Sequence, residues 1–212
     1  ANSKDVDIIY SATNYELIKQ YNKSNWEHHE TFQFVSVGRF HWVKGYHYAL
    51  TAIKNLQNNN LSVHYTIIAQ DHPTEEILYQ IDDLSLQENV TLIRFEAQDD
   101  VYRKICSSDC MLLPSVEEGI ANVVLEAMVI GLPVISSNCG GMGEIIDHQK
   151  NGFLFRNRDV DHLTQIMIDM INLDTTQRRI MAETARARVK KKHNLPRLGD
   201  EMKELYKAIE FA

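Results

Sequence analysis

Short apolar, β-branched runs alternate with longer amphipathic segments through the middle of the chain. The short runs are FQFVSV, VHYTIIA, NVTLIRF, CMLLP and PVISS, and a segment with helical spacing of apolar residues follows each one. We predict those helices at residues 45–57, 74–85, 99–106, 121–130 and 142–148. Such regular alternation is typical of a parallel sheet with helices on both faces. The pattern therefore predicts an α/β fold with a Rossmann-like layered centre.

The two ends of the chain have different patterns from the centre. Residues 1–31 are polar and weakly patterned, and we interpret them as a linker or lead-in from a missing N-terminal domain, with one short helix. Residues 32–194 form the predicted Rossmann-like domain. After the apolar run GFLF the chain turns helical, with helices expected at 159–172, 174–192 and 196–210. Residues 195–212 are assigned to a C-terminal helix that extends the domain.

Composition narrows the classes of partner and compartment. In 212 residues, 22 Lys and Arg stand against 29 Asp and Glu, giving a net charge of −7, so no nucleic acid partner is expected. The three cysteines form no CxxC pair, which suits a reducing compartment. No run of about 18 apolar residues is present to form a transmembrane helix. These features predict a cytoplasmic protein.

A basic cluster near the C-terminus leaves a second location open. The cluster comprises Arg186, Arg188, Lys190, Lys191, Lys192 and His193. Such a cluster can contact an anionic membrane, which would place the protein peripherally at its inner face. The more common alternative, which we favour, is the solvated C-terminal end of a helix, where cations complement the helix dipole.

The loop SVGRFHWVKG joins the first predicted strand to the first predicted helix. Gly38 ends the strand, and Arg39 and Lys44 lie in the turn before the helix. Two cations beside a helix N-terminus are unfavourable unless an anion joins them, so the loop suits a diphosphate. A pair of solvated surface cations remains an equal alternative. The loop matches neither GxxxxGK[ST] nor GxGxxG, so it gives no support for ATP hydrolysis or NAD binding.

The stretch EEGIANVVLEAM places two carboxylates eight positions apart. Glu126 is the only charge in an otherwise apolar predicted helix, so it needs hydrogen-bond donors from the protein or from ligand hydroxyls. Glu118 lies just before that helix, beside Gly119. At 1.5 Å rise per residue the two carboxylates would be roughly 10 Å apart, so one extended ligand could contact both. The structural alternatives are a helix N-terminal carboxylate for Glu118 and a buried salt bridge for Glu126.

Three segments in this order, VGRFHWVKG, LPSVEEGIANVVLEAMVIGLPVISSNCGGMGEII and NGFLF, resemble a known family. They are similar to the C-terminal, donor-binding domain of the group 1, or family 4, retaining glycosyltransferases. The resemblance implies one half of a GT-B architecture, in which two Rossmann-like domains face a cleft. It also implies a nucleotide-diphosphate sugar as donor substrate, with no metal and no other cofactor.

The resemblance also implies a role for each matching residue. Arg39 and Lys44, after Gly38, would hold the diphosphate, Glu126 the ribose hydroxyls and Glu118 the transferred sugar, so Glu118, Arg39 and Lys44 are the expected catalytic residues. The sugar and phosphate would lie against the backbone of Gly119, Ile120, Ala121 and Asn122.

The implied activity is transfer of a hexose-type sugar with retention in polysaccharide or glycoconjugate biosynthesis. Its acceptor would be a saccharide or a lipid-linked molecule, and the missing N-terminal domain would bind it. Some positions depart from the family pattern, among them Asp71 and Arg94 where small turn residues or glycine are usual. A non-catalytic sugar-nucleotide binding module and a sugar-nucleotide epimerase remain alternative functions.

Overall fold

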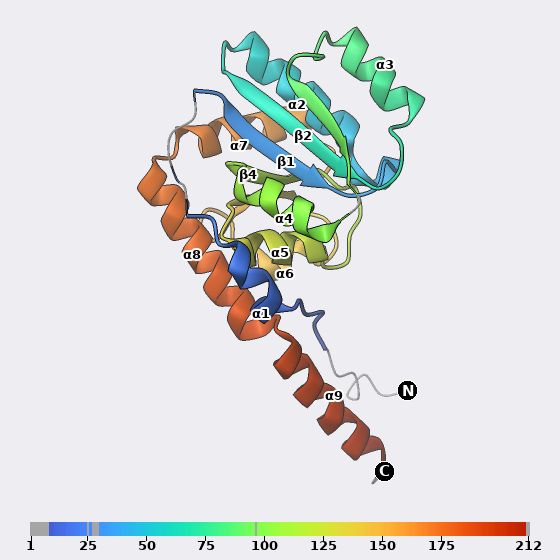
Figure 1. Cartoon of the computed structure of the whole chain (residues 1–212), viewed down its shortest axis with the longest axis vertical. Coiled ribbons are helices and arrows are strands. Elements are labelled where there is room, and N and C mark those ends of the chain that lie inside the picture. The colour runs from blue at the N-terminus through green and yellow to red at the C-terminus, as the bar shows by residue number, and fades with distance from the viewer. Residues whose placement is uncertain (1–8, 25, 27–29, 96, 211–212) are drawn as a thin grey trace.

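The computed structural model describes residues 9–24, 26, 30–95 and 97–210, and its centre is one parallel sheet (Figure 1). The six strands lie in the order β3-β2-β1-β4-β5-β6. Their bounds are β1 Phe32–Val37, β2 Val63–Ala69, β3 Val90–Arg94, β4 Cys110–Leu113, β5 Val134–Ser137 and β6 Phe153–Phe155. The predicted α/β fold with a Rossmann-like parallel sheet is therefore confirmed.

Helices cover both faces of the sheet, as the alternating pattern predicted. One face packs against α2 (Tyr46–Asn58), α3 (Glu75–Asp83) and α7 (Val160–Asn172). The other packs against α4 (Gln98–Cys106), α5 (Asn122–Ile130) and α6 (Met142–Ile145). Adjacent residues of β1 point to opposite faces, so Phe34 belongs to the first core and Val35 to the second. Because both faces are buried, the strands are apolar along most of their length.

The predicted helix boundaries hold to within two residues except at α6. That helix was expected to reach residue 148, but it ends at Ile145 because Ile146 adopts an extended backbone conformation. The side chain of Asn151, which is buried, accepts a hydrogen bond from the Asp147 N–H at 2.7 Å and donates to the Ile145 carbonyl at 2.9 Å. These two bonds satisfy the backbone groups that another helical turn would have paired.

The described part of residues 1–31 packs against the second face. It contains α1 (Tyr15–Ile18) and the 3₁₀ helix η1 (Lys19–Tyr21), and Ile18 is buried in the core beside α5. The Lys23 backbone N–H donates to the Ile130 carbonyl, and its ammonium group donates to the Ser108 carbonyl at 2.6 Å. At the other end, α8 (Thr175–Lys192) is followed by α9 (Leu195–Glu210), which projects away from the sheet (Figure 1).

The basic cluster at the end of α8 is less solvated than expected. Arg186 donates to the carbonyls of Val129 and Ile130, and Arg188 pairs with Asp147 at 2.6 Å. His193 is buried and the two arginines are partly buried, which leaves the three lysines as the exposed members of the cluster. The solvated helix end that we favoured therefore holds for the lysines, which lie in the last turn of α8, whereas the two arginines anchor the helix to the end of α5 and to the loop after α6. Within the described ranges, no helix is both long and apolar enough to cross a membrane.

Candidate functional site

The strand order sets where a ligand can enter the sheet. From β1 the chain crosses to β2 and β3 on one side, then returns to β4 on the other side of β1. The loop after β1 leads to α2 on one face of the sheet and the loop after β4 leads to α5 on the other face, so the two connections part at the carboxyl ends of these strands. Ligands of doubly wound sheets bind at this topological switch point. Residues 38–45 and 114–121 form these two loops, and we call the edge of the sheet where they adjoin the crevice.

The two loops are in direct backbone contact. The Val116 N–H donates to the Val43 carbonyl at 2.7 Å. Gly45, the N-cap of α2, has φ +65°, and a Cβ placed there would lie 2.1 Å from the Pro114 carbonyl oxygen. A residue without a side chain is thus required at position 45 for this approach. The contact fixes the position of Lys44 relative to the loop that follows β4.

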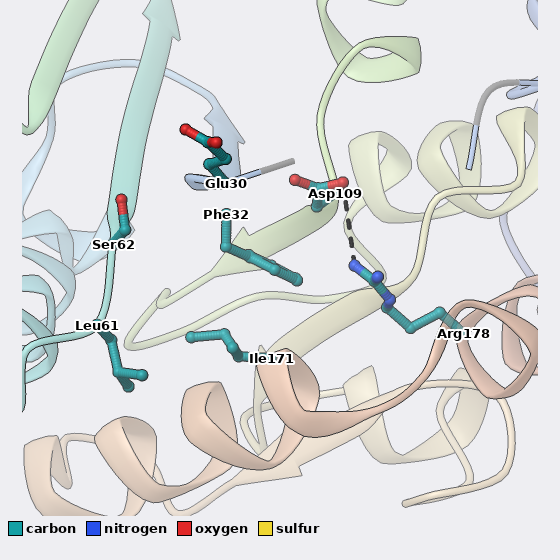
Figure 2. A pocket seen from close by; sticks show the side chains of 7 residues that line it. All are labelled: Glu30, Phe32, Leu61, Ser62, Asp109, Ile171 and Arg178. Carbon is teal, nitrogen blue, oxygen red and sulfur yellow. Dashed lines mark ion pairs between the residues drawn. The ribbon is translucent and has the colours of Figure 1, made fainter. Parts of the chain in front are cut away.

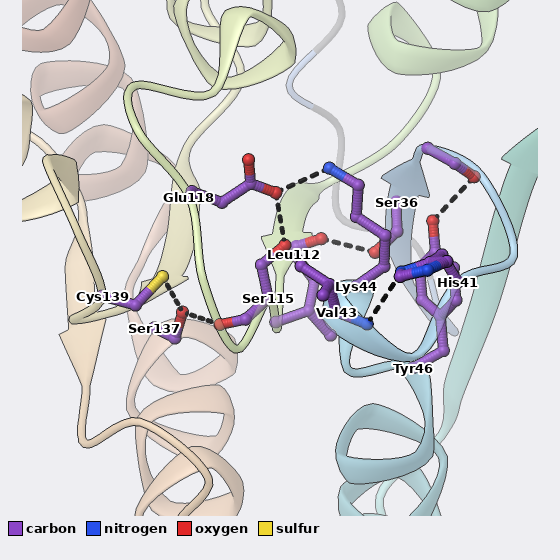
Figure 3. A network of polar contacts seen from close by, with 11 residues as sticks. Ser36, His41, Val43, Lys44, Tyr46, Leu112, Ser115, Glu118, Ser137 and Cys139 are labelled. Atoms are coloured by element: carbon purple, nitrogen blue, oxygen red, sulfur yellow. Dashed lines mark hydrogen bonds and ion pairs between the residues drawn. The ribbon is translucent and has the colours of Figure 1, made fainter.

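Lys44 and Glu118 form an ion pair across the crevice (Figure 3). The Lys44 Nζ lies 2.6 Å from Glu118 Oε1, and the Ser115 hydroxyl donates to the same oxygen at 2.7 Å. Their side chains are only 23% and 14% exposed, so water screens the pair weakly. Lys44, the last residue of the 3₁₀ helix η2 (Trp42–Lys44), is therefore not the solvated surface cation that the sequence left open.

The helix N-terminal role considered for Glu118 was also wrong. The carboxylate bonds to Lys44 and Ser115, and α5 begins four residues later with Ala121 as its N-cap. No side chain in the described parts of the chain caps α5. Its first N–H groups, with the positive end of the helix dipole, thus remain for an anion or a polar ligand.

Two serines that were not predicted, Ser115 and Ser137, stabilise the loop that carries Glu118. Ser137, at the end of β5, is fully buried, and its hydroxyl donates to the Ser115 carbonyl (Figure 3). The same hydroxyl lies 3.2 Å from the Cys139 sulfur. A buried serine at the carboxyl end of a central strand was the available signal, but many such serines only satisfy backbone groups.

A third loop, residues 138–141 after β5, holds the backbone around Gly119. The Gly141 N–H donates to the Gly119 carbonyl at 2.9 Å, and a Cβ on Gly140 would overlap the Glu118 carbonyl oxygen. On Gly119 itself, by contrast, an added Cβ would have no neighbouring atom within 4 Å. The backbone of Gly119 therefore borders open space at the crevice.

Ile120, Ala121 and Asn122 continue the chain from Gly119 into α5. Ala121 is buried, and Ile120 packs partly against the core of the second face. Asn122, the first residue of α5, has an exposed side chain. The expected ligand-facing segment, Gly119 to Asn122, thus lies at the uncapped start of the helix.

On the opposite loop, the backbone around Arg39 is fixed from two directions. The Tyr46 hydroxyl donates to the Gly38 carbonyl at 2.9 Å, and the Phe40 N–H donates to the Asp71 carboxylate at 2.9 Å. Asp71, which departs from the family pattern, thus holds this loop from the end of β2. The Arg39 side chain is exposed and forms no ion pair within the described residues.

Glu126 lies in the second turn of α5, and its side chain is partly buried. Burial raises its pKa above the ordinary value for a glutamate, and a hydrogen bond from the Tyr102 hydroxyl opposes this shift. Burial and the Glu126 charge raise the pKa of Tyr102 to about 12, so its hydroxyl is a donor at neutral pH. Among the residues that the structure describes, Glu126 has no cation partner, which contradicts the buried salt bridge. No pattern of residues indicated that Tyr102, on α4, would lie beside it.

The protein-family model for glycosyl transferases group 1 matches residues 18–188 of the chain. The chain belongs to this family. The sheet and the switch-point loops all lie within the matched range, so the resemblance identified from the sequence is confirmed. Among the described residues, no three His, Cys, Asp or Glu side chains are grouped as a metal site would require.

Two relatives of known name match a large part of the chain. The amylovoran biosynthesis glycosyltransferase AmsK of Erwinia amylovora is 32% identical over 146 residues, 66% of this chain and 36% of the relative. An Escherichia coli protein named UDP-Gal:alpha-D-GlcNAc-diphosphoundecaprenol alpha-1,3-galactosyltransferase is 28% identical over 180 residues, 83% of this chain and 45% of the relative. The chain thus spans less than half the length of these two relatives.

A solved structure confirms the fold. Anabaena Alr3699/HepE in complex with UDP superimposes with a TM-score of 0.83 at 21% identity, covering 98% of this chain and 59% of that protein. The sheet and its helices therefore have the Rossmann-like fold of the matching part of that structure.

Proposed function

We propose that this chain is the donor-binding half of a retaining hexosyltransferase that uses a nucleotide-diphosphate sugar, in polysaccharide or glycoconjugate biosynthesis. The proposal rests on three features that lie together at the switch point. There, the Lys44–Glu118 pair, the uncapped start of α5 and the open face of Gly119 border one crevice. Cations and helix N–H groups suit a diphosphate, and carboxylates suit sugar hydroxyls.

The diphosphate would bind beside Lys44 and the uncapped N-terminus of α5, within reach of Arg39 on the same loop as Lys44. Without ligand, Glu118 neutralises Lys44. A diphosphate brings more negative charge than one carboxylate, so it would take over Lys44 and release Glu118 Oε1 to accept a hydrogen bond from the transferred sugar. Arg39, exposed and without a partner in the described residues, can move toward the second phosphate. The cations then stabilise the charge that develops on the leaving diphosphate.

Glu126 would bind the ribose of the same donor. Its two oxygens offer several acceptor positions, and Tyr102 occupies one of them. Ribose hydroxyls would complete the hydrogen bonds of a carboxylate that burial otherwise destabilises. The spacing of Glu118 and Glu126 along the chain then matches the two ends of one sugar nucleotide.

Retention would follow from attack on the same face as the leaving group. A bond forms between the acceptor oxygen and the anomeric carbon as the bond from that carbon to the phosphate oxygen breaks. The acceptor proton passes to the departing phosphate oxygen. Glu118 is held by Lys44 and Ser115 rather than standing free, which favours a role as hydroxyl acceptor over one as nucleophile.

Several partners belong to the proposal as well. The acceptor would be a saccharide or a lipid-linked molecule, bound with an N-terminal half that faces this domain across a cleft. The E. coli relative carries UDP-Gal and a diphosphoundecaprenol substrate in its name, and HepE was solved with UDP. UDP and its sugars are therefore the first ligands to test, in a protein that we place in the cytoplasm.

A thermal-shift panel of UDP, GDP, ADP and their sugars tests donor binding on this chain. We expect one nucleotide series to raise the melting temperature, because ligand at 100 times its Kd stabilises a native state by about 2.7 kcal/mol. The Glu126→Ala variant should lose most of that shift with the sugar nucleotide. No stabilisation by any member of the panel would refute the donor-binding proposal.

Replacing Gly119 with alanine is expected to weaken donor binding without loss of stability. The new methyl group meets no protein atom, so the melting temperature should stay near that of the wild type. In the complex it would enter the space of the sugar and phosphate, and the affinity should fall roughly tenfold, about 1.4 kcal/mol. Calorimetric titration measures the affinity of Gly119→Ala and of the control variant Gly199→Ala. Gly199 is another glycine at which an added Cβ has open space. Unchanged affinity would place the donor elsewhere.

A further inference from the structure

A second cavity opens at the same edge of the sheet, on the other side of the loop after β1. It has a volume of about 480 Å³ and lies between residues 40–47 and the start of α3. Phe40 and Tyr46, which line it, pack in the core of the first face, whereas Glu126 and the rest of α5 lie on the second face. The proposed nucleotide position therefore leaves this cavity, which we call the Trp42 cavity, without an assigned ligand.

Aromatic side chains form much of its surface. The Phe40 and Tyr46 rings pack edge to face with centroids 5.7 Å apart and are buried. Trp42, in contrast, is 63% exposed, which is unusual for the largest apolar side chain. A tryptophan ring left open beside a cavity offers a flat apolar surface to a ligand.

Polar groups on α3 and α2 face the aromatic surface across the cavity. Glu76 and Gln80, one helical turn apart, both line it, together with His47. The Gln80 amide nitrogen donates to the His47 carbonyl and to the Thr51 hydroxyl, so the amide is oriented and its oxygen remains an acceptor. Hydrogen bonds from its own backbone N–H and from Thr74 lower the pKa of Glu76, which keeps the carboxylate charged.

The charge of the lining narrows the class of ligand. Among the described residues that line the cavity, none is Lys or Arg, and Glu76 is negative. Burial lowers the pKa of His47, so this histidine is neutral at physiological pH. The described lining therefore offers no lysine or arginine to a phosphate or an anionic lipid headgroup. It suits a neutral molecule that has both an apolar face and several hydroxyl groups.

We propose that the Trp42 cavity binds a neutral saccharide unit. One face of a pyranose ring carries C–H groups that can lie against Trp42, while its hydroxyls donate to the Glu76 carboxylate and the Gln80 amide oxygen. Because the cavity lies beside Arg39 at the same edge of the sheet, this unit would be part of the acceptor. That last assignment rests on the proposed donor function, whereas saccharide binding itself does not.

Saturation-transfer difference NMR on this chain tests the proposal. The probes are methyl α-glucoside, methyl α-galactoside, N-acetylglucosamine, cellobiose and N,N′-diacetylchitobiose at millimolar concentrations. We expect saturation transfer to at least one of them, at least tenfold weaker binding in Trp42→Ala and weaker binding in Glu76→Gln. Tyr79→Ala is the matched control, since Tyr79 is 71% exposed on α3 but does not line the cavity.

Each outcome bears on one proposal separately. Absence of transfer to every probe, or equal transfer in Trp42→Ala and wild type, would overturn the saccharide site. The thermal-shift panel with nucleotides is run on the same samples. Saccharide binding without any nucleotide binding would refute the donor-binding proposal and leave the saccharide site standing, while the reverse result would remove only the saccharide site.

Discussion

Replacing Lys44 with alanine is expected to weaken the binding of a nucleoside diphosphate by roughly 10- to 150-fold. The magnitude corresponds to about 1.5–3 kcal/mol, the usual contribution of a hydrogen bond to a charged group. The ammonium group is only partly exposed and is already oriented by Glu118, whose carboxylate Ser115 holds, so little side-chain entropy is lost when it binds phosphate. The loss of Lys44 also leaves Glu118 without its cation, and the remaining carboxylate would repel the phosphates.

Calorimetric titration with UDP, or with whichever diphosphate gives the largest thermal shift, measures this effect on the chain itself. Lys54→Ala is the matched control, because Lys54 lies on α2 and its ammonium group contacts Gln57. Arg39→Ala should give a smaller loss than Lys44→Ala, since Arg39 is exposed and solvent screens its charge. Affinity within twofold of wild type in Lys44→Ala would remove Lys44 from the diphosphate site.

Much of the fold could be predicted because the central strands are buried on both faces. A continuous apolar run such as VHYTIIA leaves few alternatives to a central parallel strand when an amphipathic helix follows it. The end of α6 could not be predicted in the same way. It depends on hydrogen bonds with the side chain of Asn151, a residue in the loop beyond the helix, and local periodicity contains no information about such contacts.

Residue types and loop positions predicted the individual site residues better than their partners. A cation after one strand and a carboxylate after another both suggested ligand binding. Their direct pairing could not be foreseen. Lys44 and Glu118 are 74 positions apart, and they are close in space because β1 and β4 are neighbours in the sheet. Alternation of strands and helices does not specify strand order. The same limit explains why Tyr102 was not predicted beside Glu126.

Replacing Gly45 with alanine is expected to destabilise the protein by about 2–6 kcal/mol. A non-glycine residue at φ +65° costs about 1–3 kcal/mol, and the new Cβ would lie 2.1 Å from the Pro114 carbonyl oxygen, so the two loops would have to separate at a further cost of about 1–3 kcal/mol. Chemical denaturation with urea measures the free energy of unfolding. Gly119→Ala is the matched control, because it adds the same methyl group to the same crevice without a steric conflict.

The location of Gly45 connects this loss of stability to the site. Separation of the loops would break the Val116–Val43 backbone hydrogen bond and move Lys44 away from Glu118. Nucleotide affinity in Gly45→Ala should therefore fall even at temperatures where the variant remains folded, whereas in Gly119→Ala only affinity should fall. If Gly45→Ala were as stable as wild type, the close approach of the loops would not be required for the fold. In that case the Lys44–Glu118 geometry would have to depend on Ser115 and Ser137 alone.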